Sequence, residues 1–182
     1  MKSVFSFFTI KPVLIALAVL VGLANPVKAM DDDNSVSLTI TNQVEDELLA
    51  PILVAPVKYD SKIFVGDYVS AAAEHQILTG DPVMTVEAIG KKAKVVHDTD
   101  GPPAVLLAPG KSVTIEVKAR RGEALRIIAM VAPTRYADHF VTAVINTKAG
   151  IPLSLDRYDI GHDEDRKSTE YLSAGAALVT IN

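Results

Sequence analysis

The chain has 182 residues, no cysteine, no tryptophan and a formal net charge of −4. Without cysteine there can be no disulfide, no Cys-ligated metal, no thiol nucleophile and no lipid-modified Cys, which excludes a lipoprotein anchor. The acidic balance disfavours nucleic acid and anionic membranes as partners, and an aromatic content of 5% leaves few side chains for stacking on bases or sugars.

The first 29 residues have the three parts of a secretory signal peptide. Lys2 and Lys11 form a positive region, residues 13–23 an apolar core of about eleven residues, and Val27-Lys28-Ala29 a small-residue cleavage site. This core is shorter than the ~20 residues of a membrane-spanning helix, so we predict a signal peptide at 1–29, with an uncleaved anchor as the alternative. Cleavage would leave no stable membrane anchor.

The predicted mature chain, residues 30–182, fits one domain of ordinary size. Three lysines leave with the signal, so 15 of the 18 basic and all 22 acidic residues remain, a formal net charge of −7. No Asn-x-Ser/Thr sequon occurs, which fits a bacterial exported protein. We therefore expect a secreted or periplasmic location.

Two strands are predicted near the start of this domain. Residues 35–41 alternate strictly, so that their three apolar side chains share one face. Residues 48–57 form an apolar run interrupted by Pro51 and Pro56. Because proline cannot donate to a strand ladder, this second strand is expected at a sheet edge or at bulged positions.

One short helix is predicted over residues 70–78, with Ser70 as its N-cap and a glycine as its stop. Residues 83–89 and 94–97 then indicate two further strands. The segment between them, residues 90–92, has the composition of a hairpin turn.

The second half of the domain reads as strands and turns. Pro109-Gly110 stand in the order of a type II turn and lead into an alternating strand at 112–117. The apolar run 125–132 predicts a buried strand that delivers the chain to an acid-bearing loop. A second acid-bearing turn begins at Asp159, roughly twenty residues after the first, a spacing at which a strand out and a strand back return to the same sheet edge. A last strand is predicted at 176–181.

About nine short strands, frequent turn signals and one short helix predict an all-β fold, an antiparallel β-sandwich. The sequence has none of the strong enzyme signatures, such as a nucleophile elbow, a His-Glu-x-x-His helix, a dinucleotide fingerprint or a phosphate loop. Its four histidines are scattered, so a zinc site would have to be assembled by the fold. A Ser-His-Asp triad has no fixed spacing and stays open.

Carboxylates are the more informative candidates. Residues 98–101, Asp-Thr-Asp-Gly, resemble the start of an EF-hand loop, but the bidentate Glu at the twelfth position is missing, and we interpret them as an ordinary turn. Residues 159–165 form a denser acidic run, which is either a solvated loop or a source of oxygen ligands for a hard cation.

The chain resembles the amino-terminal domain of the spondins, the F-spondin and mindin type of extracellular domain, which also occurs as a stand-alone secreted bacterial protein. The resemblance covers residue 36 to about residue 165 and depends on the order of its markers. These are Thr39-Ile40-Thr41-Asn42, Pro51-Ile52-Leu53-Val54, Phe64-x-Gly66 with Ser70 and Ala73-Glu74, the run Leu107 to Val117, Met130-Val131-Ala132-Pro133-Thr134, Asp138-x-Phe140-Val141 and Tyr158-Asp159-Ile160-Gly161.

The resemblance implies a C2-like β-sandwich with one calcium site. Carried over by position, its ligands are Glu116, Asp138 and Asp159. Glu116 stands in an alternating strand where its side chain points outward, and only the family pattern raises it above a solvated residue. Asp138 departs from the family by two extra residues after the Pro-Thr pair, although Phe140 can anchor the following strand in the core. Asp163 could join the ligands.

Three functions follow as hypotheses. The first is a secreted calcium-binding β-sandwich that acts as a binding or adhesion module for an extracellular or cell-surface ligand. The second is a periplasmic hydrolase whose site combines a histidine with the acidic loop end. The third is a metal-free structural domain with solvated acids. Carboxylates that converge without a cation repel one another, which favours the first hypothesis if they do converge.

Overall fold

The computed structural model describes residues 34–96, 106–120, 122–132, 138–148, 152–161 and 168–182. The predicted signal peptide, the turn at 98–101 and Asp163 lie outside these residues. Within the described residues, no helix is both long and apolar enough to cross a membrane.

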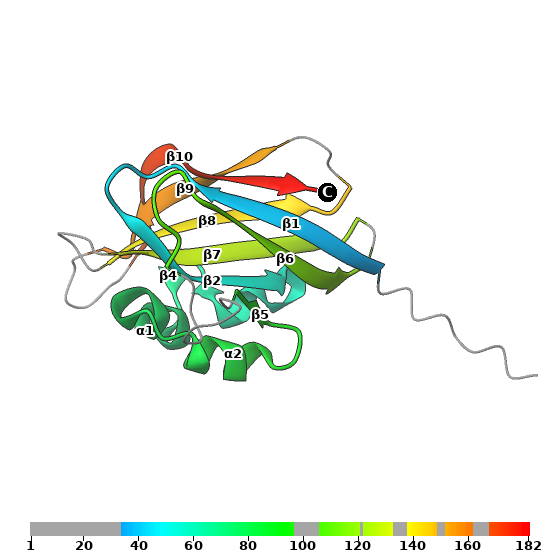
Figure 1. The fold of residues 1–182 in the computed structure, drawn as a ribbon. Coiled ribbons are helices and arrows are strands. Elements are labelled where there is room, and N and C mark those ends of the chain that lie inside the picture. The colour runs from blue at the N-terminus through cyan, green and yellow to red at the C-terminus, as the bar shows by residue number, and fades with distance from the viewer. Residues whose placement is uncertain (1–33, 97–105, 121, 133–137, 149–151, 162–167) are drawn as a thin grey trace, which may run out of the picture. The chain divides into compact units, whose positions relative to one another are not determined.

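Eight strands form one antiparallel sheet in the order β5-β2-β7-β8-β9-β10-β1-β6 (Figure 1). A separate two-stranded hairpin joins β3 and β4. The structure is therefore mostly β, in agreement with the predicted all-β class. The strands are β1 (Asn34–Asn42), β2 (Leu48–Pro56), β3 (Phe64–Val65), β4 (Tyr68–Val69), β5 (Lys94–Val95), β6 (Ser112–Ala119), β7 (Ala124–Ala132), β8 (His139–Asn146), β9 (Leu153–Asp159) and β10 (Glu170–Ile181).

The sheet is nearly closed on itself. Leu49 of β2 and Leu107, which precedes β6, exchange two backbone hydrogen bonds of 3.0 and 2.9 Å. They bring β2, the second strand of the order, next to the segment that leads into β6, its last strand. The curved sheet encloses a buried apolar cluster that draws on every long strand. Representative members are Leu38, Ile52, Ile115, Ile127, Val141, Leu155 and Val179.

A second apolar cluster packs the other face of β2, β7 and β8 against the helices. Ile128 and Phe140 project from the sheet to meet Ala73 and Ile77 of α1 (Ala71–Thr79). Phe140 is fully buried, as predicted for an anchor of its strand. Figure 1 shows α1 and α2 (Val83–Ile89) together along this side of the sheet.

The predicted helix is confirmed as α1. The Ser70 hydroxyl accepts a hydrogen bond from the Ala73 amide at 3.2 Å, and Gly80 closes the helix in the left-handed conformation. The prediction of only one helix is wrong, because η1 (Val57–Lys62) is a 3₁₀-helix and α2 is a second α-helix.

Residues 83–89 form α2 instead of the predicted strand, and the turn at 90–92 joins this helix to β5 instead of closing a hairpin. Just before the helix, the Asp81 carboxylate accepts a hydrogen bond from the amide of Val83, the first residue of α2, at 2.9 Å. Thr85 and Ile89, one helical turn apart, are both buried, and the Thr85 hydroxyl donates to the Ala72 carbonyl at 3.0 Å. Tertiary packing thus overrides the strand propensity of this segment.

Proline positions agree with their predicted roles. Pro51 lies within the register shift of β2 between Leu49 and Ile52, a bulged position. At Pro109-Gly110, the Lys111 amide donates to the Ala108 carbonyl at 3.0 Å, which closes the predicted turn.

Candidate metal centre

The centre forms where β8 begins and β9 ends. His139 is the first residue of β8, Asp159 the last of β9, and the two stand opposite each other in the antiparallel register. Asp138 directly precedes β8, and its carbonyl accepts a hydrogen bond from the Ile160 amide at 3.1 Å. A strand out and a strand back therefore return the chain to one sheet edge, as the spacing of the acids predicted.

Three side chains converge at this edge. One ligand atom each from Asp138, His139 and Asp159 lies within 4.8 Å of the other two. Asp138 is 8% exposed and Asp159 is 7% exposed. Two carboxylates are thus held close together in a largely desolvated place.

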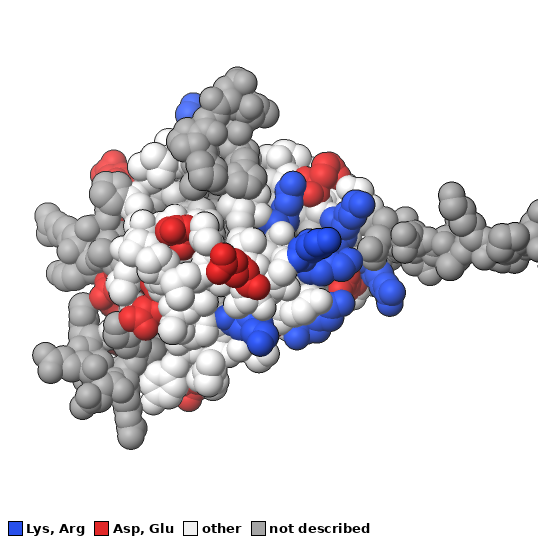
Figure 2. Space-filling view, turned by 90° about the horizontal axis from the view of Figure 1, so that it is seen from below, with Lys and Arg blue, Asp and Glu red and all other residues white. Residues whose placement is uncertain are grey.

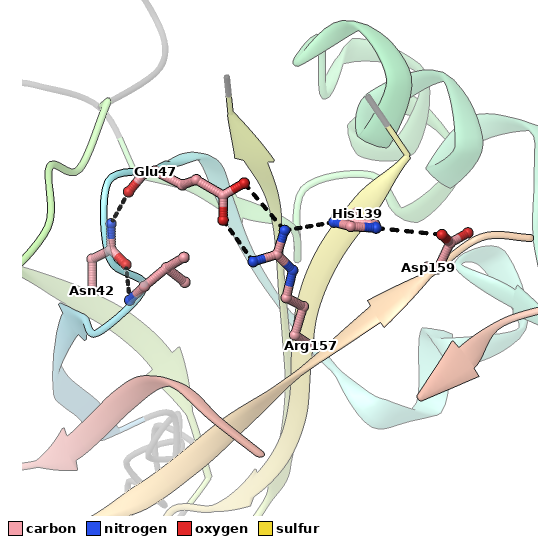
Figure 3. A network of polar contacts seen from close by, with 6 residues as sticks. Asn42, Glu47, His139, Arg157 and Asp159 are labelled. Atoms are coloured by element: carbon pink, nitrogen blue, oxygen red, sulfur yellow. Dashed lines mark hydrogen bonds and ion pairs between the residues drawn. The ribbon is translucent and has the colours of Figure 1, made fainter. Parts of the chain in front are cut away.

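A line of polar contacts leads from this group across the sheet (Figure 3). The Asp159 Oδ2 atom lies 3.3 Å from His139 Nε2, and His139 Nδ1 lies 2.5 Å from an Arg157 guanidinium nitrogen. Arg157 in turn binds Glu47 through two hydrogen bonds of 2.6 and 3.2 Å. Asn42 donates to the Glu47 carbonyl at 2.8 Å and so fixes the far end of the line.

Arg157 determines the tautomer of His139. A guanidinium can only donate, so Nδ1 must accept, and the proton of the neutral ring lies on Nε2, facing Asp159. A histidine that binds a metal ordinarily donates its other ring N–H to an acceptor. Here the other nitrogen faces a cation, so His139 is arranged to orient Asp159 rather than to bind zinc through Nε2.

Gly161 holds the other oxygen of Asp159. Its amide donates to Asp159 Oδ1 at 2.6 Å. The residue has φ +91°, and a Cβ at this position would lie 2.6 Å from the Ser168 carbonyl oxygen. Only glycine fits this close approach, which gives a physical reason for the glycine of the Tyr-Asp-x-Gly marker.

Tyr158 and Phe140 fix the backbone beside the centre. Their rings stack with centroids 5.6 Å apart, and the two residues are partners in the β8–β9 register. Because Phe140 is fully buried, the strand ends that carry Asp138 and Asp159 are anchored to the helix-covered core.

Glu116 does not belong to this group. It lies exposed on β6, and two strands, β10 and β1, separate β6 from β9 in the sheet. Its Oε2 accepts a hydrogen bond from the Ser35 hydroxyl at 2.6 Å, and hydrogen bonds from Ser35 and Ser37 lower the pKa of Glu116 below its ordinary value. The structure therefore brings together two of the three predicted ligands and places His139 beside them.

No protein family model and no curated protein matches this chain. The resemblance to the spondin domain consequently stays a prediction.

His139, Arg157 and Glu47 were not predicted at the site. His139 directly follows Asp138 in the sequence, but its position opposite Asp159 depends on strand register. Glu47 and Arg157 are 110 residues apart, and nothing local in the sequence indicates that they pair.

Proposed function

We propose that this protein is a secreted calcium-binding module in which Asp138 and Asp159 supply carboxylate ligands and His139 orients Asp159. The observation that carries the proposal is the convergence of two buried carboxylates within 4.8 Å of each other. The C2-like arrangement and the spondin resemblance belong to this proposal, as does the role of a binding or adhesion module for an extracellular or cell-surface ligand.

Electrostatics favours a cation between the aspartates. Two carboxylates whose ligand atoms lie within 4.8 Å of each other repel by roughly 3 kcal/mol or more at an effective dielectric constant of about 20. Arg157 already shares its charge with the carboxylate of Glu47. A cation bound between the two aspartates would relieve their mutual repulsion.

The donor set fits calcium better than zinc or magnesium. Calcium takes oxygen ligands in irregular geometry, magnesium demands a tight octahedron, and zinc prefers imidazole or thiolate ligands. Zinc binding through His139 Nε2 would require that nitrogen to lose the proton that the Arg157 contact assigns to it.

A melting experiment tests the centre. Calcium at about 100 times its Kd should stabilise the folded state by ~2.7 kcal/mol, which raises the melting temperature of a domain this size by roughly 5 to 10 °C. Asp138→Asn and Asp159→Asn should each abolish the shift.

Glu116→Gln is the matched control, because it removes one exposed carboxylate on β6, which two intervening strands separate from β9. This variant should keep the full calcium shift. Absence of any shift in the unmodified protein, or an equal shift in Asp159→Asn, would leave the metal-free structural domain as the function. A larger shift with zinc than with calcium would overturn the oxygen-ligand assignment.

The His139–Asp159 contact also supports a second candidate, a hydrolase in which this pair acts as acid and base. Catalysis needs a place for substrate beside the pair. Two cavities among the described residues border β5 and β6, away from this pair. We rank the binding module first because two carboxylates converge at the centre, and hydrolysis lost in a His139→Gln variant that still folds would reverse that order.

A further inference from the structure

A groove lies between the two ends of the sheet. One cavity of about 210 Å³ is lined by residues of β5 and β6, and a neighbouring cavity of about 480 Å³ extends along β6. Lys94 and Glu116 line both cavities, so the two are adjacent, and we refer to them together as the groove. The larger cavity is within the ~300 to 1,000 Å³ typical of ligand sites.

Both walls of this groove are edge strands. β5 and β6 are the two ends of the strand order, and β5 pairs only with β2 while β6 pairs only with β1. The Leu49–Leu107 contact lies before β6 begins. Among the described residues, no other strand pairs with the edge of β6 that faces away from β1. An edge strand offers a row of backbone donors and acceptors to an added strand.

The groove is basic in an acidic protein. Among the residues that the structure describes, four lysines line it, Lys91, Lys92, Lys94 and Lys118, together with the carboxylate of Glu116. All four are exposed. Figure 2 shows Lys and Arg side chains gathered in one part of this side of the molecule.

The depth of the groove is apolar. Ile115 and Val117 of β6 and Val95 and Val96 of the opposite wall line it, and each is less than 10% exposed. An extended strand presents alternate side chains to opposite faces. An occupant with apolar residues at every second position would meet this floor, and acidic residues between them would face the lysines.

We propose that the groove binds an extended acidic peptide, in which acidic and aliphatic residues alternate, as an added strand on the free edge of β6. The lysines supply charge complementarity, and the backbone of β6 supplies the hydrogen bonds. This surface is separate from the Asp138–Asp159 centre, so either proposal can fail without the other.

Fluorescence anisotropy with a labelled peptide of about seven alternating Glu and Val residues tests the groove. The peptide should bind, and its affinity should fall as salt concentration rises. The double variant Lys94→Glu, Lys118→Glu should weaken binding roughly tenfold or more, since two attractive contacts become repulsive. Lys111→Glu with Lys148→Glu changes the net charge equally outside the groove and should keep affinity within about twofold.

Changes in the peptide test the added strand without altering the protein. A peptide of the same composition with its Val residues grouped should bind roughly tenfold more weakly. Its Val side chains cannot all point to the apolar depth of the groove while its Glu side chains point to the lysines. N-methylation at alternate residues removes the donors along one edge, and one of the two possible phases should abolish binding.

Equal binding of the two N-methylated phases and the parent peptide would overturn the added strand. Equal or tighter binding of a sulfated polysaccharide, competitive with the peptide, would identify the groove as a general polyanion surface instead. No peptide binding at low salt would overturn the proposal. Asp159→Asn should leave peptide binding unchanged, which separates this surface from the cation centre.

Discussion

His139 lies between a cation and an anion: the Arg157 guanidinium contacts one of its ring nitrogens and the Asp159 carboxylate lies near the other. Arg157 neutralises Glu47 and also fixes the imidazole, whose remaining proton then faces Asp159. Glu47 and Arg157 side chains are 19% and 18% exposed, so the pair is mostly shielded from water. Removal of one partner of such a pair lowers the free energy of unfolding, because the other charge is then buried and unpaired.

Replacement of Arg157 by Met tests this line. We expect the free energy of unfolding, measured by urea denaturation, to fall by about 2 to 3 kcal/mol, because Glu47 loses both of its strong hydrogen bonds in a shielded place. The double variant Glu47→Gln, Arg157→Met should recover part of that loss, since no charge is then stranded. Equal losses in the single and double variants would contradict the pairing as the source of stability.

The two aspartates could be predicted from sequence, but their surroundings could not. Asp138 and Asp159 precede and end a pair of strands whose combined length returns the chain to one edge, which local patterns indicate. Glu116 was included from the family pattern alone, whereas alternation along β6 already pointed its side chain outward. Arg157 and Glu47 meet because of the order in which the strands pair, and no local periodicity in the sequence reveals that order.

At the scale of elements, β1 and β6 are joined by side-chain pairs on their exposed face as well as by the backbone ladder. Ser35 and Glu116, Thr39 and Thr114, and Thr41 and Ser112 are hydrogen-bonded in pairs across the two strands. Such cross-strand pairs each add modestly to strand association. Only the first pair includes an ionisable group.

Stability should therefore depend on pH through Glu116. Hydrogen bonds from Ser35 and Ser37 lower its folded-state pKa below the ordinary value of 4.5, so the folded state favours the ionised carboxylate. That contribution is present above pH 4.5 and is lost as the pH falls through the lower folded-state pKa. The stability difference between the unmodified protein and Glu116→Gln, from urea titrations, should shrink over that range, and a difference that stays constant with pH would contradict this role of Glu116.

The segment 83–89 shows where element prediction fails. Its β-branched residues favour a strand, yet Asp81-Pro82 immediately before it is a recognisable helix start that outweighs this preference once Thr85 and Ile89 pack inward. By contrast, Ser70 and Gly80 bracket α1 with capping signals at both ends, and that helix was predicted correctly.

For the molecule as a whole, the sheet is complete only when β10, the last strand in the sequence, pairs with β1. β1 lies between β6 and β10, so the first and last long strands are neighbours. Val179 of β10 is fully buried in the enclosed cluster, whereas the next residue, Thr180, is only partly buried and belongs to the opposite side of the strand.

Two adjacent substitutions test this dependence. Val179→Asp puts an unpaired charge inside the sheet and should cost more than about 4 kcal/mol, enough to abolish a cooperative thermal transition followed by circular dichroism. Thr180→Asp should cost about 1 kcal/mol or less. Comparable losses in both variants would contradict the enclosed core between β1 and β10.

The neighbouring positions of β1 and β10 also govern the time course of folding. Thr39 and Asn182 share a hydrogen bond of 3.0 Å although 143 residues separate them in sequence. A nascent chain cannot pair β1 with β10 until residues 177–181 have been synthesised, and closing so long a loop is slow. Until then β1 has one open edge, so a molecular chaperone would find its substrate at β1.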